Sequence, residues 1–250
     1  MKTIRVGTLL FWLTLTASGQ SVSGLLTDAN EVMAKMSLND AQREMLSQGY
    51  AGRRLYILDN ERMHKHSELL VEVQCDPAGA KHFEVVSEEG WSSANKHVLK
   101  KMLESEVETS GASLRPKTRL TADNYNFSLA GTQWLEGRPT YVIDVVPKRA
   151  DKYLFEGRIW VDGHDYALVR VEGRPARNPS AWTRSVHFTH QYQQSAGFWF
   201  PSTTESVTQA LVFGRTEVTI RYFDYRPNTA SVLGSNPRKA SFKERSYVEH

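Results

Sequence analysis

The sequence is poor in cysteine and in net charge. A single cysteine, Cys75, among 250 residues excludes an intramolecular disulfide. Lys and Arg number 31 and Asp and Glu number 28, so the net charge is only +3 and the charges are interspersed. Such a chain lacks the basic footprint of a nucleic-acid-binding protein, and we expect no nucleic acid as partner. Its length and its 40% apolar residues predict a globular protein with a sizeable core.

Motifs for catalysis and for cofactor binding are also missing. The sequence has no Gly-x-Ser-x-Gly, Gly-x-Gly-x-x-Gly, His-Glu-x-x-His or Cys-x-x-Cys motif. His187 and His190 are three residues apart on an expected strand, which places them on opposite faces. The segment from Asp162 to Asp165 lies between two expected strands and is better explained as a β-turn. We therefore expect no enzyme, no cofactor and no metal site.

The first nineteen residues have the composition of a secretory signal peptide. Lys2 and Arg5 precede an apolar run over residues 6–17, and Ala17 and Gly19 provide the small residues of a cleavage site. The run is shorter than the about 20 residues needed to cross a bilayer. We expect cleavage after Gly19 and export of a soluble chain to the periplasm. No cysteine lies near this site, so we expect no lipoprotein-type acylation.

Two amphipathic helices are expected in the remaining chain. Apolar residues recur at helical spacing over residues 28–46, with a pause near Asn39 that predicts a second short helix there. The other stripe covers residues 94–107, where Ser92 or Ser93 can cap the helix. Because both helices have an apolar side, we expect both to lie on an apolar surface.

Most of the chain alternates apolar and polar residues with period two, which predicts about ten strands. They cover residues 50–58, 69–75, 81–86, 125–135, 140–146, 153–161, 166–171, 182–192, 198–212 and 215–225. Short turns between successive strands indicate an antiparallel meander. Ten such strands twist too strongly to stay flat, so we expect a barrel or half-barrel, with Gly157 at a sharp bend. Cys75, alternating with Val71 and Val73, is expected to be a small buried side chain.

Aromatic residues are concentrated in the second half of the chain, and two interpretations of them stay open. They fill the interior of a small barrel, or they line a pocket for an apolar ligand. Alternation does not decide which way Trp160 points. The candidates for the wall of a lipid-binding cavity are Phe127, Tyr141, Phe155, Ile159, Trp160, Trp182, Phe188, Trp199, Val218 and Ile220.

Several segments together carry a resemblance to a known family. They are Tyr50-x-x-Arg53-Arg54-x-Tyr56-x-Leu58, Asn124-Tyr125-x-Phe127-x-Leu129, Tyr141-Val142-Ile143-x-Val145-x-Pro147-Lys148, the run from Phe155 to Gly173, and Phe198-Trp199-Phe200-Pro201. The chain resembles a divergent branch of the outer-membrane lipoprotein-sorting proteins, the LolA-like superfamily. The resemblance implies a fold that is mainly β (α+β): an unclosed antiparallel β-barrel of about ten strands with amphipathic helices as a lid. The functional arginine of the carrier is not placed, since Arg53, Arg54 and Arg62 all fit.

The resemblance also implies a domain organisation and a function. We expect a signal peptide at 1–19, a half-barrel domain at 20–226 and a loosely ordered tail at 227–250. The expected function is that of a soluble, monomeric periplasmic carrier, which holds acyl chains of lipids or lipoproteins in a hydrophobic cavity for transfer towards the outer membrane. Membrane donor and acceptor proteins are further candidate partners. The alternatives are a sensor or interaction domain of the same fold that binds a protein, and a secreted enzyme.

Overall fold

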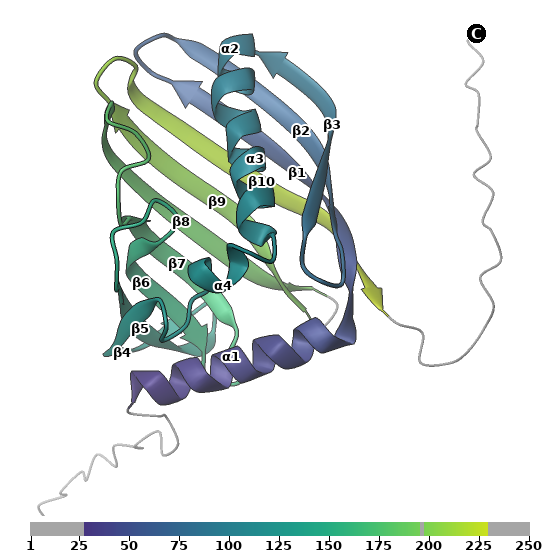
Figure 1. Cartoon of the computed structure of the whole chain (residues 1–250), viewed down its shortest axis with the longest axis vertical. Coiled ribbons are helices and arrows are strands. Elements are labelled where there is room, and N and C mark those ends of the chain that lie inside the picture. The colour runs from purple at the N-terminus through teal and green to yellow at the C-terminus, as the bar shows by residue number, and fades with distance from the viewer. Residues whose placement is uncertain (1–27, 196–197, 230–250) are drawn as a thin grey trace, which may run out of the picture.

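Ten antiparallel strands form one sheet whose edge strands, β3 and β4, are not paired with each other in the described part of the chain (Figure 1). The computed structural model describes residues 28–195 and 198–229. The expected signal peptide at 1–19 lies outside these residues, as do residues 230–250 of the expected tail. The open sheet with its helices confirms the predicted fold class.

The strands follow one another through the sheet in the order β3-β2-β1-β10-β9-β8-β7-β6-β5-β4. Their bounds are β1 (Ser47–Asn60), β2 (Lys65–Cys75), β3 (Lys81–Gly90), β4 (Tyr125–Leu135), β5 (Arg138–Pro147), β6 (Phe155–Asp162), β7 (Leu168–Pro175), β8 (Thr183–Ser195), β9 (Phe198–Ala210) and β10 (Gly214–Thr229). Strand β10 thus includes residues 227–229, which the sequence assigned to the tail. Strands β1 to β3 and strands β4 to β10 each form a series of antiparallel hairpins, and the pairing of β1 with β10 joins the two series into one sheet. The helical segments lie in the connection between the edge strands β3 and β4.

Two helical segments accompany the sheet. Helix α1 (Ala29–Leu46) runs across the lower end of the half-barrel in Figure 1, and α2 (Ser92–Ala94), the π-helical turn η1 (Asn95–Leu99) and α3 (Lys100–Ser110) continue one another in front of the sheet. The short α4 (Arg115–Thr118) follows. Among the described helices, none combines the length and the apolar character that a membrane crossing requires.

The structure corrects three details of the expected helices. Helix α1 continues through Asn39 without a break, so no second helix begins there, and the Asn39 side-chain amide donates to the carbonyl of Asp165 (3.0 Å). Trp91, rather than Ser92 or Ser93, precedes the first helical residue, and no side chain caps this helix. Val98, expected on the apolar face, is 39% exposed, because the π-turn shifts the helical register.

The interior has two apolar clusters with different helices above them. Val32, Met33 and Met36 of α1 pack on the inward residues of β4 to β7, including Tyr141 and Ile159. The other cluster places Leu99 and Leu103 on β1, β2 and β10. The end of the half-barrel covered by α1 is therefore a filled core.

Gly157 and Gly173 face each other on β6 and β7. A Cβ atom at Gly157 would lie 2.0 Å from the carbonyl oxygen of Glu172 and 2.6 Å from the Cα of Gly173. A glycine is required at this position because the two backbones approach too closely for any side chain. The glycine that the sequence placed at a bend therefore permits a close approach of the two strands.

Candidate functional site

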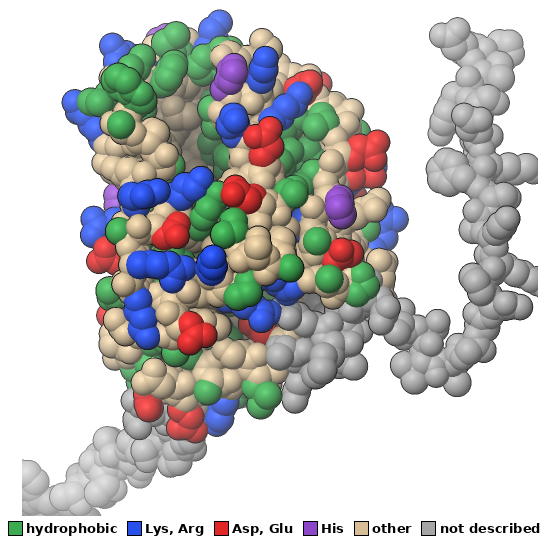
Figure 2. Space-filling view, in the orientation of Figure 1, with side chains coloured by type: hydrophobic (Ala, Val, Ile, Leu, Met, Phe, Trp, Pro, Cys, Tyr) green, Lys and Arg blue, Asp and Glu red, His purple; other side chains and the backbone are tan. Residues whose placement is uncertain are grey.

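A cavity of about 1070 Å³ lies between α3 and the inner face of the sheet. Its wall combines apolar and ionisable side chains from several strands and from the helix, among them Tyr50, Lys81, Met102, Glu106, Val186 and Val218. Ligand pockets in proteins commonly enclose about 300–1,000 Å³, so the space is large enough for a sizeable molecule. Figure 2 shows the surface hollowed beside the helix.

A smaller apolar space of about 270 Å³, here called the annex, adjoins this cavity. The two spaces share Lys152, Tyr153 and His190 in their walls. The annex is otherwise lined mainly by apolar side chains, namely Leu120, Leu154, Phe155, Leu168, Val171 and Phe188. The annex borders the filled core, since Phe155 and Phe188 also pack against it. The large cavity therefore has a partly polar wall, and the annex has a mainly apolar one.

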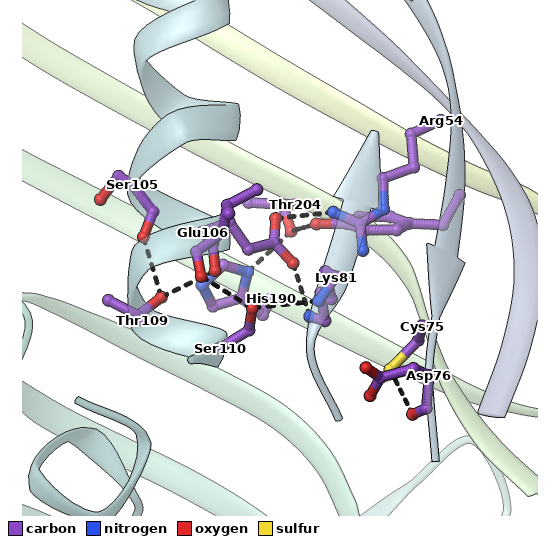
Figure 3. Close-up of polar contacts among 12 residues, drawn as sticks. Arg54, Cys75, Asp76, Lys81, Ser105, Glu106, Thr109, Ser110, His190 and Thr204 are labelled. Atoms are coloured by element: carbon purple, nitrogen blue, oxygen red, sulfur yellow. Dashed lines mark hydrogen bonds and ion pairs between the residues drawn. The ribbon is translucent and has the colours of Figure 1, made fainter. Parts of the chain in front are cut away.

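A buried ion cluster connects α3 to the strands behind it (Figure 3). The guanidinium of Arg54 on β1 donates to the Glu106 carboxylate on α3 (2.7 Å), and the ammonium of Lys81 on β3 donates to the other oxygen of Glu106 (2.6 Å). Arg54 is only 1% exposed and lies between the rings of Phe83 and Tyr222. A charge so deeply buried requires a partner of opposite sign, and Glu106 is that partner.

The cluster keeps its charges at neutral pH. Burial opposes ionisation of Glu106, but the neighbouring Lys81 and Arg54 outweigh it and lower the pKa of the carboxyl to about 2. Burial likewise opposes the charge on Arg54 and on Lys81, yet Glu106 raises the pKa of both. The three residues therefore contain two positive charges and one negative charge.

The polar side chains beside the cluster are neutral. His190 on β8 shares a hydrogen bond with the Thr204 hydroxyl (2.7 Å), which is 3.0 Å from the hydroxyl of Tyr222. Burial lowers the pKa of His190 to about 4 and raises the pKa of Tyr222, so neither group is charged near pH 7. His190 therefore contributes a neutral, hydrogen-bonded ring to the walls of both spaces.

Seven of the ten predicted cavity residues lie on the inner side of the sheet. Val218 lines the large cavity, and Phe155 and Phe188 line the annex. The other four belong to the packed clusters: Tyr141, Ile159 and Phe127 at the end covered by α1, and Ile220 under α3.

The three predicted tryptophans lie elsewhere. Trp160 belongs to a small cluster on the opposite face of the sheet, where its indole N–H donates to Gln133 (2.9 Å). Trp199 packs against that cluster, and its indole N–H donates to Asp165 (3.1 Å). Trp182 is 65% exposed. None of the three lines the cavity.

Of the three candidate arginines, the structure places one inside the half-barrel. Arg53 pairs with Glu72 on the outer face (2.9 Å), and Arg62 is exposed in the β1–β2 hairpin. Arg54 lies inside because Gly52, Arg54, Tyr56 and Leu58 alternate inward along β1. This alternation is visible in the sequence and could have identified Arg54.

Cys75 lies at the cavity wall and is only partly buried. Cys75 is the last residue of β2 and follows Val71 and Val73 on the inward side of that strand. Its position at the end of the strand explains its partial exposure, which the sequence did not predict. Burial raises the pKa of its thiol, which disfavours the reactive thiolate. Within residues 28–195 and 198–229, no group of three or more His, Cys, Asp or Glu side chains is arranged to hold a metal ion.

Residues 94–226 match a family model described as a family of unknown function, DUF5686. The match covers more than half of the 250 residues. The chain belongs to this family. The DUF5686 match includes α3 and seven of the strands, and its description assigns no activity. No curated protein sequence matches the chain.

Several solved structures are similar to this DUF5686 chain at low sequence identity. One is described as an outer membrane lipoprotein-sorting protein domain from Vibrio parahaemolyticus (14% identity, TM-score 0.43), covering 83% of this chain and 95% of that one. A LolA superfamily protein from Nitrosomonas europaea gives 11% identity and a TM-score of 0.39, covering 85% and 96%. A DUF1329 family protein from Desulfovibrio piger gives 12% and 0.40, covering 81% and 95%. The first two of these structures are described by the names of the group that the sequence resembles, and likenesses this remote carry no argument about superfamily or function.

Proposed function

We propose that this chain is a carrier that holds an acyl chain of a lipid or lipoprotein in the cavity beside α3. The observation that carries the proposal is the cavity itself, of about 1070 Å³, together with its apolar annex. A filled half-barrel would have no room for a ligand. Here Leu99 and Leu103 pack part of the contact between the helical segment and the sheet, and the cavity lies beside that packed contact.

The energetics of lipid transport support such a role. Exposing an acyl chain to water costs about 0.8 kcal/mol per methylene, so a chain of about fifteen methylenes costs about 12 kcal/mol. A lined cavity offsets this cost, whereas scattered surface residues do not. Transfer through the periplasm towards the outer membrane, from a membrane donor to an acceptor protein, is the proposed setting.

Helix α3 is proposed as the lid of this cavity. Its buried Leu103 and the ion pairs of Glu106 attach it to the strands, while Met102 and Ser105 of the same helix line the cavity. A ligand enters or leaves by displacing contacts of this helix. The strength of those contacts then determines how readily cargo is released.

A binding titration with a fluorescent fatty-acid analogue tests the proposal. We expect saturable binding to the folded chain, and at least tenfold weaker binding by Val186→Asp, because a charge in the cavity wall disfavours an apolar ligand. Val146→Asp is the matched control, since Val146 is 48% exposed and does not line the cavity. Absence of saturable binding, with no lipid co-purifying by mass spectrometry, would overturn the carrier and favour a protein-binding domain.

A further inference from the structure

The cavity contains more positive than negative charge. Among its ionisable lining residues are four cations, Lys81, Lys101, Arg115 and Lys152, and two acids, Asp76 and Glu106. Lys101 is already paired with Glu104 outside the lining (3.5 Å), so the excess of positive charge rests on the other cations. Arg54, directly behind Glu106, adds a further cation. The histidine and the tyrosines nearest to the cluster are neutral near pH 7, so they do not reduce this excess.

Lys81 is the cation best placed to meet a ligand. Its side chain is 25% exposed and lines the cavity, whereas Arg54 is enclosed between two aromatic rings. An ammonium group has three N–H donors, and the contact with Glu106 uses one of them. A second anion can therefore bind Lys81 without breaking the ion cluster.

The mainly apolar annex shares His190, Lys152 and Tyr153 with the wall of the charged cavity. His190 lies beside Glu106 in Figure 3 and lines both spaces, so a molecule at Lys81 can extend past it among Phe155, Leu168 and Phe188. A ligand that fits both regions has one anionic end and one long apolar chain.

We propose that the cavity selects an anionic amphiphile, an acyl or alkyl chain that ends in a carboxylate or a phosphate. The anionic group binds the Lys81 ammonium, and the chain lies in the cavity and its annex. This inference rests on the proposed carrier function and adds the headgroup charge to it. Neutral and cationic amphiphiles of the same length are discriminated against because they leave the excess positive charge unbalanced.

The test compares ligands that differ only at the headgroup. Hexadecanoate, hexadecyl phosphate and hexadecan-1-ol compete with a neutral apolar dye for the full-length folded chain. We expect at least one of the two anions to bind about tenfold or more tightly than the alcohol, and the tighter anion identifies the headgroup. Lys81→Gln should reduce the ratio of anion affinity to alcohol affinity to nearly one; the ratio is the readout, because loss of the Lys81–Glu106 ion pair can change the affinity for every ligand.

Two further variants test whether the preference for anions depends on the positive charge of Lys81. Lys100→Gln removes the same charge from α3, but Lys100 pairs with Glu88 outside the cavity, so the preference should persist. Lys81→Arg retains the charge and should retain the preference.

Equal affinities of the folded wild-type chain for the anions and the alcohol would overturn the anionic selectivity alone. Failure of all three ligands to displace the dye would overturn the carrier function as well.

Discussion

Arg54 shows what a single sequence reveals about a site and what it does not. Its inward direction follows from the alternation of Gly52, Arg54, Tyr56 and Leu58 along β1. Its partner Glu106 is 52 residues away on a helix whose placement depends on the whole sheet. The sequence left Arg53, Arg54 and Arg62 open as candidates, although the alternation along β1 distinguishes Arg54. Charge complementarity between distant elements leaves no local pattern, so the pair with Glu106 could not be predicted.

The ion cluster predicts how stability depends on pH. We expect Glu106→Gln to cost about 3 kcal/mol of unfolding free energy near neutral pH, because it leaves the buried Arg54 charge uncompensated. The pKa of Glu106 is lowered in the folded chain from an ordinary 4.5 to about 2. Its contribution is therefore complete above pH 4.5 and is lost as the pH falls towards 2. Urea unfolding of both proteins between pH 7 and pH 2.5 measures this.

A matched control separates the cluster from general charge effects. Glu104 lies on the same helix, is 68% exposed and pairs with Lys101 at 3.5 Å. Glu104→Gln should change stability by less than about 0.5 kcal/mol at every pH. A difference between wild type and Glu106→Gln that does not shrink on acidification would contradict the assignment.

The secondary-structure elements were largely predictable, because period-two and helical patterns are local. All ten strands and both amphipathic helices lie where the sequence indicated them. The errors concern the ends of elements and the register of one helix. The spacing of apolar residues does not reveal the π-helical turn at Asn95–Leu99. Within this turn Leu99 is buried, whereas Val98 is partly exposed and lines the cavity.

The burial of Leu99 and the exposure of Val98 predict losses of stability of different size when each is replaced by alanine. Leu99 is fully buried against β1, β2 and β10, so Leu99→Ala should cost about 2–4 kcal/mol of unfolding free energy. Val98→Ala should cost less than about 1 kcal/mol, because the side chain is 39% exposed. Thermal or urea unfolding of the two variants measures both values, and similar costs would show that the stripe has the register expected for an uninterrupted α-helix.

At the scale of the molecule, the sequence left a filled barrel and an open pocket as alternatives, and the structure contains both. The distinction depends on which helix covers which strands. Val32, Met33 and Met36 of α1 fill the space over β4 to β7, whereas α3 meets β1, β2 and β10 and leaves the cavity beside it. Helix placement is a property of the complete fold, so strand patterns alone could not decide between a core and a pocket.

The two ends should respond differently to the same kind of substitution. Ile159 is fully buried in the filled core, so Ile159→Thr should cost about 2–4 kcal/mol of unfolding free energy, through lost apolar contact and a buried hydroxyl. Val186 lines the cavity and is half-buried, so a hydroxyl there can be hydrated; Val186→Thr should cost less than about 1.5 kcal/mol and should weaken binding of the fatty-acid analogue. Urea unfolding and the binding titration measure both quantities. A Val186→Thr chain as unstable as Ile159→Thr would mean that the space beside α3 closes in solution, because only a dry, packed site penalises the hydroxyl so strongly.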